Sequence, residues 1–423
     1  MKEKIKSNLL VIYIIINALY LFICSYLCTI EKITYKTFGQ TMKYASIINL
    51  IVCGLFIIYK KFIKKDFKLK IYDVFLILIA VFALISTHYA ISKKVALSGS
   101  YLRYEGLYAI LYYLTLTFLS SFLNHKQKKI VVYSIVCVGL FQAIYGYLQY
   151  QNAPFVNVIL HGKTIWVTGL TTNPNFYGTI MLLVTSYLIG LFIDNDDLLE
   201  KGILIVGLII SLMGLLISNT LSALVGLIVV LLVSLIYCLK YKKYRKIGIL
   251  LIVVVCETIL LHKLEMTTLV NDLSQTKNEA IEISKGNLNN NYGTKRLGIW
   301  KKTMPIVPKH LLHGVGIDNF TYAFNGKPLI MGNKIYDKAH NGYLQILVTQ
   351  GIFSLLSFLG LYIVAIVNGI KKGLKEKEVY LVLPIIGYLI QDFFNISVIE
   401  VTPFFFIALG LLINREKKTK SNA

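Results

Sequence analysis

Three polar stretches interrupt this otherwise apolar chain and hold most of the residue types that could do chemistry: residues 99–106, residues 166–175, and the segment from 296 to 345. Arg103 and Arg296 carry guanidinium groups, whose planar fork of N–H donors can bind the oxygens of an anion in pairs. His340 adds an imidazole, which titrates near neutral pH and can therefore accept or donate a proton. Anion binding and proton transfer are the chemistry these residue types allow.

Two of the stretches also carry signals that begin helices. Asn173 stands before Pro174, and this pair suits the N-cap and first turn of a helix. Asn341 precedes another apolar run in the same way. Because the free N–H groups at a helix N-terminus give it a partial positive charge, both helix starts are expected to favour anions nearby.

The elements that must position these residues follow from a strongly apolar composition. Of the 423 residues, 56% are apolar and 15% are charged, against about 25% charged in an ordinary soluble protein. The mean hydropathy is +0.66. Apolar runs of roughly 16 to 26 residues recur, and about 20 suffice to cross the hydrocarbon core of a bilayer. The composition predicts an all-α integral membrane protein and excludes a secreted globule, a disordered chain and a nucleic-acid-binding domain.

We expect about twelve transmembrane helices. A β-barrel is disfavoured because the apolar runs are continuous, do not alternate, and are too long for tilted strands. The expected spans are residues 8–30, 44–59, 71–90, 106–124, 130–150, 174–193, 202–218, 221–239, 247–262, 342–367, 379–395 and 400–413.

Lys and Arg residues predict how these spans are oriented. With the N-terminus inside, the inner segments hold 26 basic residues, and the short outer loops before residue 263 hold seven. Loops rich in Lys and Arg stay in the cytoplasm, so both chain ends are expected in the cytoplasm. The protein itself is expected in the cytoplasmic (inner) membrane. The basic loops also attract anionic membrane lipid, so the net charge of +23 does not require nucleic acid as a partner.

A long polar segment between spans nine and ten breaks the pattern of short loops. Connections of nearly eighty residues are usually functional or disordered; we expect its middle, residues 285–293, to be flexible, with an interfacial helix around 296–306. The chain is thus divided into four parts: N-terminal helices at 1–262, a large extracytoplasmic loop at 263–341, C-terminal helices at 342–414, and a basic cytoplasmic tail at 415–423.

Charged and sulfur-containing residues inside the spans are expected to be structural. The six cysteines all lie in apolar runs without metal-binding spacing, which is typical of buried thiols. Glu257 and Asp392 fall within spans and should face the bundle, since facing lipid would be costly. We expect no metal and no cofactor.

The polar stretches together resemble the O-antigen ligase/polymerase superfamily. The run from Asn173 through Pro174 and Asn175 to Phe176, ahead of a span, is similar to the NPN-type signature of that superfamily. Two further matches are Arg296 and Trp300 followed by the run 314–320, and the run 339–347 ahead of Gly351-Ile352. With the span count and the large loop, the resemblance covers most of the chain, most firmly residues 99–360.

This resemblance implies a metal-independent glycosyltransferase at the outer face of the membrane. Such enzymes take a glycan from an undecaprenyl-pyrophosphate carrier and transfer it to an acceptor hydroxyl. The acceptor is a lipid-anchored core sugar in ligases and another carrier-linked repeat in polymerases; a protein-acceptor branch also exists. The expected partners are this donor, a glycan or lipid-linked acceptor, membrane lipids and, for a polymerase, a chain-length regulator.

The resemblance also implies roles for individual residues. Arg296 and Arg103 match basic positions of the family and would clamp the pyrophosphate, stabilising the charge that grows on the leaving group. His340 would act as the general base toward the acceptor hydroxyl or position it. Asn341 would cap a helix or hydrogen-bond a sugar. The remaining residues assigned to substrate binding are Lys163, Asn173, Asn175 and Trp300.

One position departs from the family pattern. Many members have Arg where this chain has Trp166. Lys163 and His161 lie nearby as substitutes, but the lysine ammonium is a point charge without the bidentate fork. This puts the second stretch in doubt as a phosphate clamp, and Trp166 could instead stack on a sugar or lie at the membrane interface.

Several alternatives stay open at this point. The two arginines could be interfacial anchors, His340 could be a water-facing residue at a helix start, and a solvated Glu105 is favoured over one that orients Arg103. A secondary transporter or lipid-linked-glycan flippase is the rival function, although such proteins usually show internal repeats that are not found here. Ligase and polymerase are not distinguished by the sequence.

Overall fold

The computed structural model describes residues 2–101, 103–161, 164–331, 334–376, 378–413 and 415, and within them the chain is mostly α-helical. Eight helices in this part of the chain are long and apolar enough to cross a membrane, and three more are apolar but shorter. A multi-pass helical membrane protein is therefore confirmed. The exact count of twelve spans stays a prediction.

Each of the twelve expected spans lies on helix, although the ends differ. The first nine expected spans correspond to α1 (Lys2–Thr29), α2 (Tyr35–Ile58), α3 (Ile71–His88), α5 (Leu107–Ser120), α6 (His125–Tyr150), α7 (Pro174–Asp194), α8 (Leu198–Ile217), α9 (Leu221–Lys240) and α10 (Tyr244–Lys263). The largest difference is in α2, which begins nine residues early because Thr34 caps it: the Thr34 side chain accepts from the Thr37 N–H. A short π-helix, η1 (Tyr59–Ile63), then extends it.

The expected tenth span is wrong as a single helix. It consists of α13 (Gly342–Gln350) and α14 (Ile352–Glu376), which meet at Gly351. Gly351 has φ +85°, a left-handed conformation that favours glycine. The Ile352 N–H donates to the Leu311 carbonyl at 2.7 Å instead of continuing the first helix. Two further helices, α15 (Val379–Asp392) and α16 (Thr402–Ile413), complete the chain.

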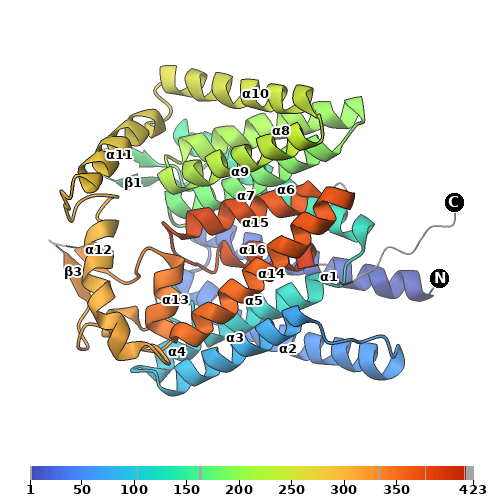
Figure 1. Ribbon diagram of the computed structural model, residues 1–423, viewed down its shortest axis with the longest axis vertical. Helices are drawn as coiled ribbons and strands as arrows, with labels where there is room; N and C mark the ends of the chain where they lie inside the picture. Colours follow the sequence, from blue (N-terminus) through green and yellow to red (C-terminus); the bar gives the residue numbers. More distant parts are fainter. Residues whose placement is uncertain are drawn as a thin grey trace.

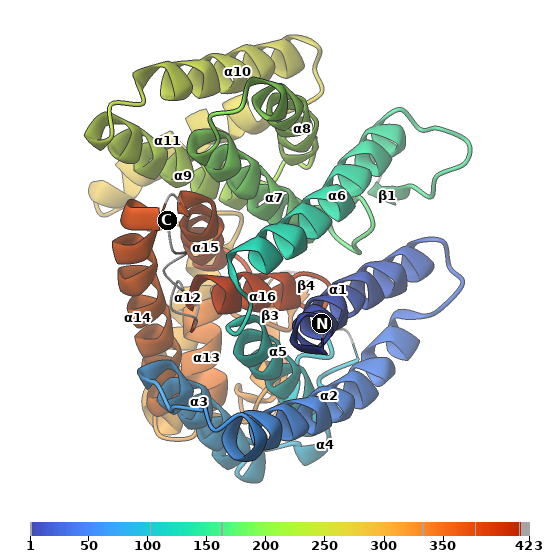
Figure 2. The same ribbon diagram turned by 90° about the vertical axis from the view of Figure 1, so that its right-hand side faces the viewer.

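The centre of the bundle is α7, whose residues from Phe176 to Ile193 are all buried. Helices α8, α9 and α15 pack around it. Viewed along the bundle, α10 lies at one edge and α2 at the opposite edge (Figure 2). A helix apolar on every side is expected to be buried in this way.

The long segment after α10 is more ordered than expected. It contains α11 (Leu269–Ser284), where no helix was expected, and α12 (Arg296–Thr303), which continues as the 3-10 helix η2 (Met304–His310) and confirms the helix expected near 296–306. A second 3-10 turn, η3 (Phe320–Tyr322), and the hairpin of β3 (Leu329–Met331) and β4 (Lys334–Tyr336) follow. Another small hairpin pairs β1 (Ile159–His161) with β2 (Thr164–Trp166) before α7.

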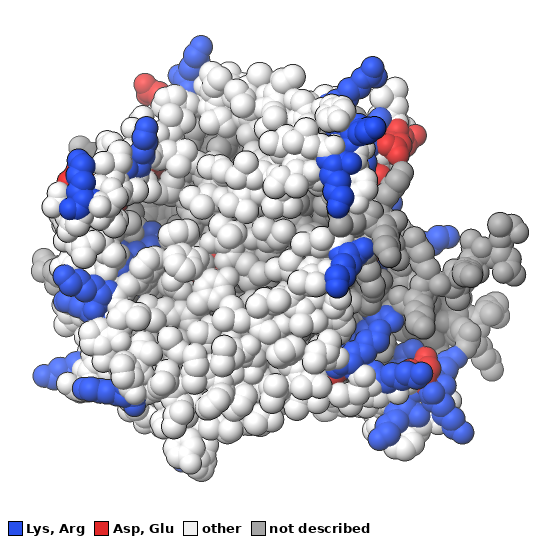
Figure 3. Space-filling model, viewed as in Figure 1, with Lys and Arg blue, Asp and Glu red and all other residues white. Residues whose placement is uncertain are grey.

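The polar elements gather at one end of the bundle, which we call the loop end: α11, α12 and the two hairpins. The start of α1 lies at the opposite end (Figure 1), as does Arg415, which contacts Lys70 and Ser121. Basic side chains lie mainly at these two ends, with a broad band that shows almost no charged side chains between them in the view of Figure 3. This distribution suits a protein surrounded by lipid at its middle.

Candidate functional site

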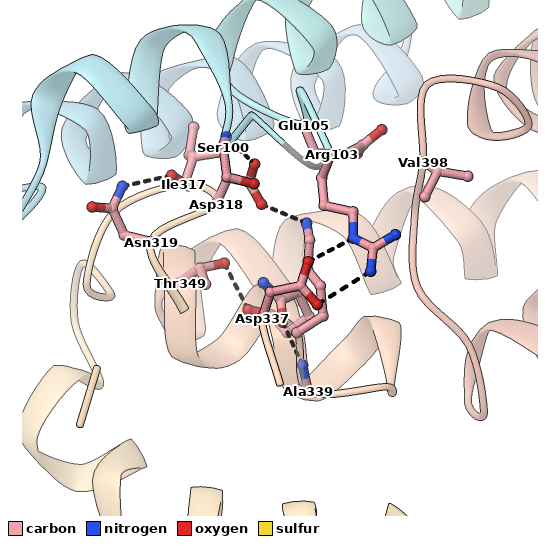
Figure 4. Close-up of polar contacts among 12 residues, drawn as sticks. Ser100, Arg103, Glu105, Ile317, Asp318, Asn319, Asp337, Ala339, Thr349 and Val398 are labelled. Atoms are coloured by element: carbon pink, nitrogen blue, oxygen red, sulfur yellow. Dashed lines mark hydrogen bonds and ion pairs between the residues drawn. The ribbon is translucent and has the colours of Figure 1, made fainter. Parts of the chain in front are cut away.

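Arg103 joins the first polar stretch to the third. Its Nε donates to Asp337 Oδ2 at 2.6 Å and its Nη2 donates to Asp337 Oδ1 at 3.2 Å (Figure 4). This two-point contact uses one edge of the guanidinium and fixes its plane. The pKa of Asp337 is lowered: burial raises it, but the hydrogen bond and charge of Arg103 outweigh this effect. The Arg103 side chain, which was expected to clamp pyrophosphate, is thus already paired with a carboxylate.

The second stretch reaches the same place through Phe176 and Thr172. The Arg103 guanidinium lies 5.8 Å from the centre of the Phe176 ring, in the first turn of α7. Thr172 donates its N–H and its hydroxyl to the buried Glu400, in the connection between α15 and α16. All three polar stretches therefore converge at the loop end of the bundle.

Asp318 and Asn319 fasten the long segment to the loop before α5. Asp318 accepts the Ser100 N–H at 2.6 Å and forms a buried ion pair with Lys338 Nζ at 2.7 Å (Figure 4). The Asn319 side chain accepts the Ser92 N–H at 2.8 Å and donates to the Ser92 carbonyl. Breaking a buried ion pair typically costs about 3–5 kcal/mol. These contacts therefore fix the long segment against the loop before α5.

Arg296 differs from Arg103 in its partners. Its Nε donates to the Phe394 carbonyl at 2.7 Å, and its Nη1 donates to Gly293 O and to Thr294 Oγ1. Among the described residues, no carboxylate pairs with it. Burial lowers the pKa of Arg296, so the fold holds a desolvated cation without a compensating charge. Such a group favours an anionic ligand.

Trp300 lies one turn further along α12 and supports the site. Its Nε1 donates to the Ala339 carbonyl at 3.0 Å, directly before His340. Its ring packs edge-on against Phe393, with ring centres 5.5 Å apart. Trp300 therefore positions the backbone around His340 in this structure.

His340 lies between the cations. Its backbone has φ +50°, a left-handed conformation that is uncommon without glycine and is often found at functional sites. Burial, together with the charges of Arg296, Arg103 and Lys338, lowers the pKa of His340 to about 4, although Asp337 opposes this shift. The imidazole is therefore neutral at pH 7 and has a free lone pair.

The remaining expected residues fall into three groups. Asn341 caps α13 by accepting the Leu344 N–H at 2.9 Å, which confirms the capping alternative. Asn173 caps α7 by accepting the Asn175 N–H at 2.9 Å, also as expected. Asn175 is half-buried in the first turn of that helix. Lys163 lies outside the described residues, and the substrate contacts of all four stay predictions.

Three carboxylates at the site were misjudged or missed. The favoured interpretation of Glu105 as solvated is wrong: it is buried and accepts a hydrogen bond from Tyr113. Burial raises the pKa of Glu105 to about 7, and it raises the pKa of Glu400 to about 7 as well. Glu400, Asp337 and Lys338 could have been noticed only as charged residues near predicted helix ends, since no short motif marks them.

A small cavity of about 60 Å³, lined by polar and apolar side chains, lies beneath these residues. Its walls include Glu105, Lys338, Gln345 and Asp392, so Asp392 faces the bundle interior as expected. Glu257 is also buried, which confirms its expected direction. The cavity has room for a few water molecules among polar partners.

The arrangement can bind an anion and accept a proton next to it. Arg296 supplies an uncompensated charge, Arg103 supplies an oriented one, and His340 supplies a neutral base. Among the described residues, no group of three or more His, Cys, Asp and Glu side chains could hold a metal ion.

Comparison with known proteins bears on the second half of the chain. A family model described as O-antigen ligase matches residues 206–359, from within α8 to within α14. The matched part contains Arg296, Trp300, His340 and Asn341, whereas Arg103, Asn173 and Asn175 lie before it. No curated protein matches the chain. The match, over residues 206–359, supports the resemblance to the O-antigen ligase/polymerase superfamily seen in the motifs.

Proposed function

We propose that this protein is a membrane glycosyltransferase that transfers or polymerises oligosaccharide carried on undecaprenyl pyrophosphate, at the outer face of the cytoplasmic membrane. The observation that carries the proposal is the desolvated, uncompensated Arg296 beside a neutral His340, at the end of a membrane bundle. The family match supports transfer of a lipid-linked glycan. The excess of basic residues in the opposite loops supports the outer location.

The proposed step joins the acceptor oxygen to the anomeric carbon of the donor sugar. The bond between that carbon and the pyrophosphate oxygen breaks, and the electron pair leaves with the pyrophosphate. Arg296 donates to this leaving group, with Arg103 as the second donor, so the growing negative charge meets groups already in place. Asp337 keeps the free edge of Arg103 turned toward the ligand.

His340 receives the proton of the acceptor hydroxyl in this scheme. A base with a pKa of about 4 is weak, but its low value depends partly on the cations around it. A bound pyrophosphate compensates their charge and raises the pKa of His340 toward neutrality. The base thus becomes stronger when the donor is present, and it stays weak in the empty site.

The protein then requires no metal and no cofactor, because arginines and helix N-termini supply the positive charge. The acceptor is a second lipid-linked glycan for a polymerase or a lipid-anchored sugar for a ligase, and a chain-length regulator is a partner only for the former. We assign substrate contacts to Asn173, Asn175, Trp300 and Asn341, and, from the sequence alone, to Lys163.

The test is glycan transfer in cells that lack this gene and carry the wild type, His340→Ala or His88→Ala. His88 is an exposed histidine at the end of α3, so its substitution controls for loss of a histidine at the same end of the bundle. Carrier-linked oligosaccharide and long surface polymer would be measured in cell extracts, together with the amount of each protein.

We expect His340→Ala to match the deletion and His88→Ala to match the wild type. Accumulation of single carrier-linked repeats would identify a polymerase, and full-length polymer left on the carrier would identify a ligase. Unchanged glycans in both the deletion and His340→Ala would refute the transferase and favour a transporter.

A further inference from the structure

A second pocket lies on the other side of the loop that carries Arg103. It has a volume of about 330 Å³ and lies between the first half of α2, the end of the short helix α4 (Lys93–Ser98) and the start of α5. Small-molecule pockets commonly occupy about 300–1,000 Å³. We call it the tyrosine pocket, after the lining residues Tyr44, Tyr104 and Tyr108.

The pocket lining combines aromatic faces with flexible polar groups. Gln40, Lys43 and Ser98 line it beside the three tyrosines, and all three are solvent-exposed. Lys43 Nζ lies 5.7 Å from the centre of the Tyr108 ring. Among the described residues, no carboxylate pairs with Lys43. Hydroxyl, amide and ammonium groups therefore surround ring faces that a ligand can reach.

Tyr104 connects this pocket to the site. It lies between Arg103, which faces Asp337, and Glu105, which faces the internal cavity. Its backbone has φ +54°, a left-handed conformation that directs successive side chains to different places. Its ring lies against Gly39, where a Cβ atom would be 2.0 Å from the ring. One loop thus supplies a wall of the tyrosine pocket and an arginine of the site.

The composition of the pocket favours a sugar over a phosphate. Pyranose rings present C–H faces that pack on aromatic rings and hydroxyls that hydrogen-bond to Tyr, Gln, Ser and Lys side chains. Phosphate sites typically use an arginine fork or several convergent cations, whereas Lys43 is the one cation among the residues that line this pocket.

We propose that the tyrosine pocket binds a sugar unit of the glycan substrate, stacked on Tyr108 and hydrogen-bonded by Lys43 and Gln40, while the reacting end of the glycan lies at Arg103. This inference rests on the proposed function, because it assigns a subsite to the same substrate. It makes the pocket the place where sugar identity is selected, apart from the pyrophosphate contacts.

Binding of free oligosaccharide tests the proposal without requiring turnover. The probe is the oligosaccharide released by mild acid from the lipid-linked glycan of the producing strain, which carries neither lipid nor phosphate. Its binding to purified protein would be measured by saturation-transfer NMR for the wild type, Tyr108→Leu, Lys43→Gln and Tyr101→Leu. Tyr101 lies in the same loop, is 76% exposed and does not line the pocket, so it is the matched control.

We expect binding to weaken about tenfold in Tyr108→Leu and measurably in Lys43→Gln, with Tyr101→Leu equal to the wild type. Lys43→Gln replaces an exposed side chain and keeps the test valid if Tyr108→Leu fails to fold. Equal binding in all four proteins, or none in the wild type, would overturn the proposal.

A parallel measurement with phosphatidylglycerol vesicles distinguishes a lipid headgroup. Binding of this lipid that depends on Lys43, with oligosaccharide binding unaffected, would assign the pocket to lipid and also overturn the proposal. The proposed function is judged separately by His340→Ala, since oligosaccharide binding at the tyrosine pocket does not require His340.

Discussion

Arg296 and Arg103 both belong to the site, but among the described residues only the charge of Arg103 is compensated by a carboxylate. Arg103 is paired at two points with Asp337, whereas Arg296 donates to carbonyl and hydroxyl oxygens. An incoming anion is therefore attracted mainly by Arg296, and Arg103 orients it through hydrogen bonds from a fixed guanidinium plane. We infer that Arg296 binds the leaving group most strongly.

Replacing Arg296 with lysine should separate charge from geometry. Arg296→Lys keeps the positive charge but loses the fork that binds two oxygens, so we expect transfer to fall about ten- to hundredfold. Transfer in isolated membranes, normalised to protein amount, would measure it. Lys301→Gln, on the exposed side of α12, is the control, and near-normal transfer by Arg296→Lys would argue against the clamp.

Asp337→Asn should lower both kcat and KM. The substitution removes a negative charge from the site, so donor binding should strengthen and KM should fall. It also frees Arg103 from its fixed plane, so we expect kcat to fall about tenfold or more. Steady-state kinetics with purified donor would measure both. A parallel loss of kcat and protein stability, without a lower KM, would indicate a merely structural role.

The protonation state of His340 can be measured through its reactivity. Diethyl pyrocarbonate modifies neutral imidazole, and a pKa of about 4 leaves His340 neutral well below the ordinary value near 6.5. We therefore expect its modification rate to stay high at pH 5.5, where a histidine peptide reacts slowly; mass spectrometry would locate the label.

At the scale of elements, the connections rather than the helices bring the site together. The break at Gly351 lets α13 end where Val315 and Gly316 donate their N–H groups to the carbonyls of Val348 and Thr349. An uninterrupted helix would carry the following residues away from Leu311 and Leu312. The position of His340, at the start of α13, therefore depends on a residue eleven positions later.

Gly351→Ala tests this break. The alanine Cβ would lie 2.4 Å from the Leu312 carbonyl oxygen, and the φ of +85° is strained for any other residue. We expect a loss of about 1–3 kcal/mol in the free energy of unfolding, seen as a lower melting temperature in detergent. Gly286→Ala has the same φ of +85° but no atom within 4 Å, so it should lose less; equal losses would show that the close contact contributes nothing.

At the scale of the whole molecule, charge and fold give the bundle two distinct ends. The loop end carries the site, and the other end carries buried ion pairs such as Lys128 with Glu378 and Arg415 with Asp73. The predicted orientation places the site outside the cell, where a glycan already moved across the membrane would meet it. This orientation comes from the Lys and Arg distribution and is open to direct measurement.

Cysteine labelling in intact cells would determine the orientation. Single cysteines at Lys277, on α11, and Lys242, between α9 and α10, would be introduced after the six native cysteines are replaced; both positions are exposed. We expect a membrane-impermeable maleimide to label Lys277→Cys directly and Lys242→Cys only after the cells are permeabilised. The reverse pattern would place the site inside and contradict the proposed function.

Local sequence signals predicted most of the long helices and the caps of two of them. Continuous apolar runs predicted where α1 to α3 and α5 to α10 lie, because a segment in lipid must satisfy its backbone polar groups internally, and a helix does so. Asn173 and Asn341 were predictable as caps, since an N-cap depends on a side chain and the N–H two or three residues later. The motifs that resemble the superfamily also predicted that Arg296 and His340 belong to one site.

Contacts between distant residues were decided by the tertiary structure alone. Arg103 and Asp337 are 234 positions apart, and no local pattern records that pairing. Glu105 looked solvated because exposure depends on neighbours from other helices, and the break at Gly351 was hidden within a continuous apolar run. Sequence patterns act over one or two turns of helix. Ion pairs, burial and pKa values depend instead on which elements pack together, and in this protein that packing assembles the site.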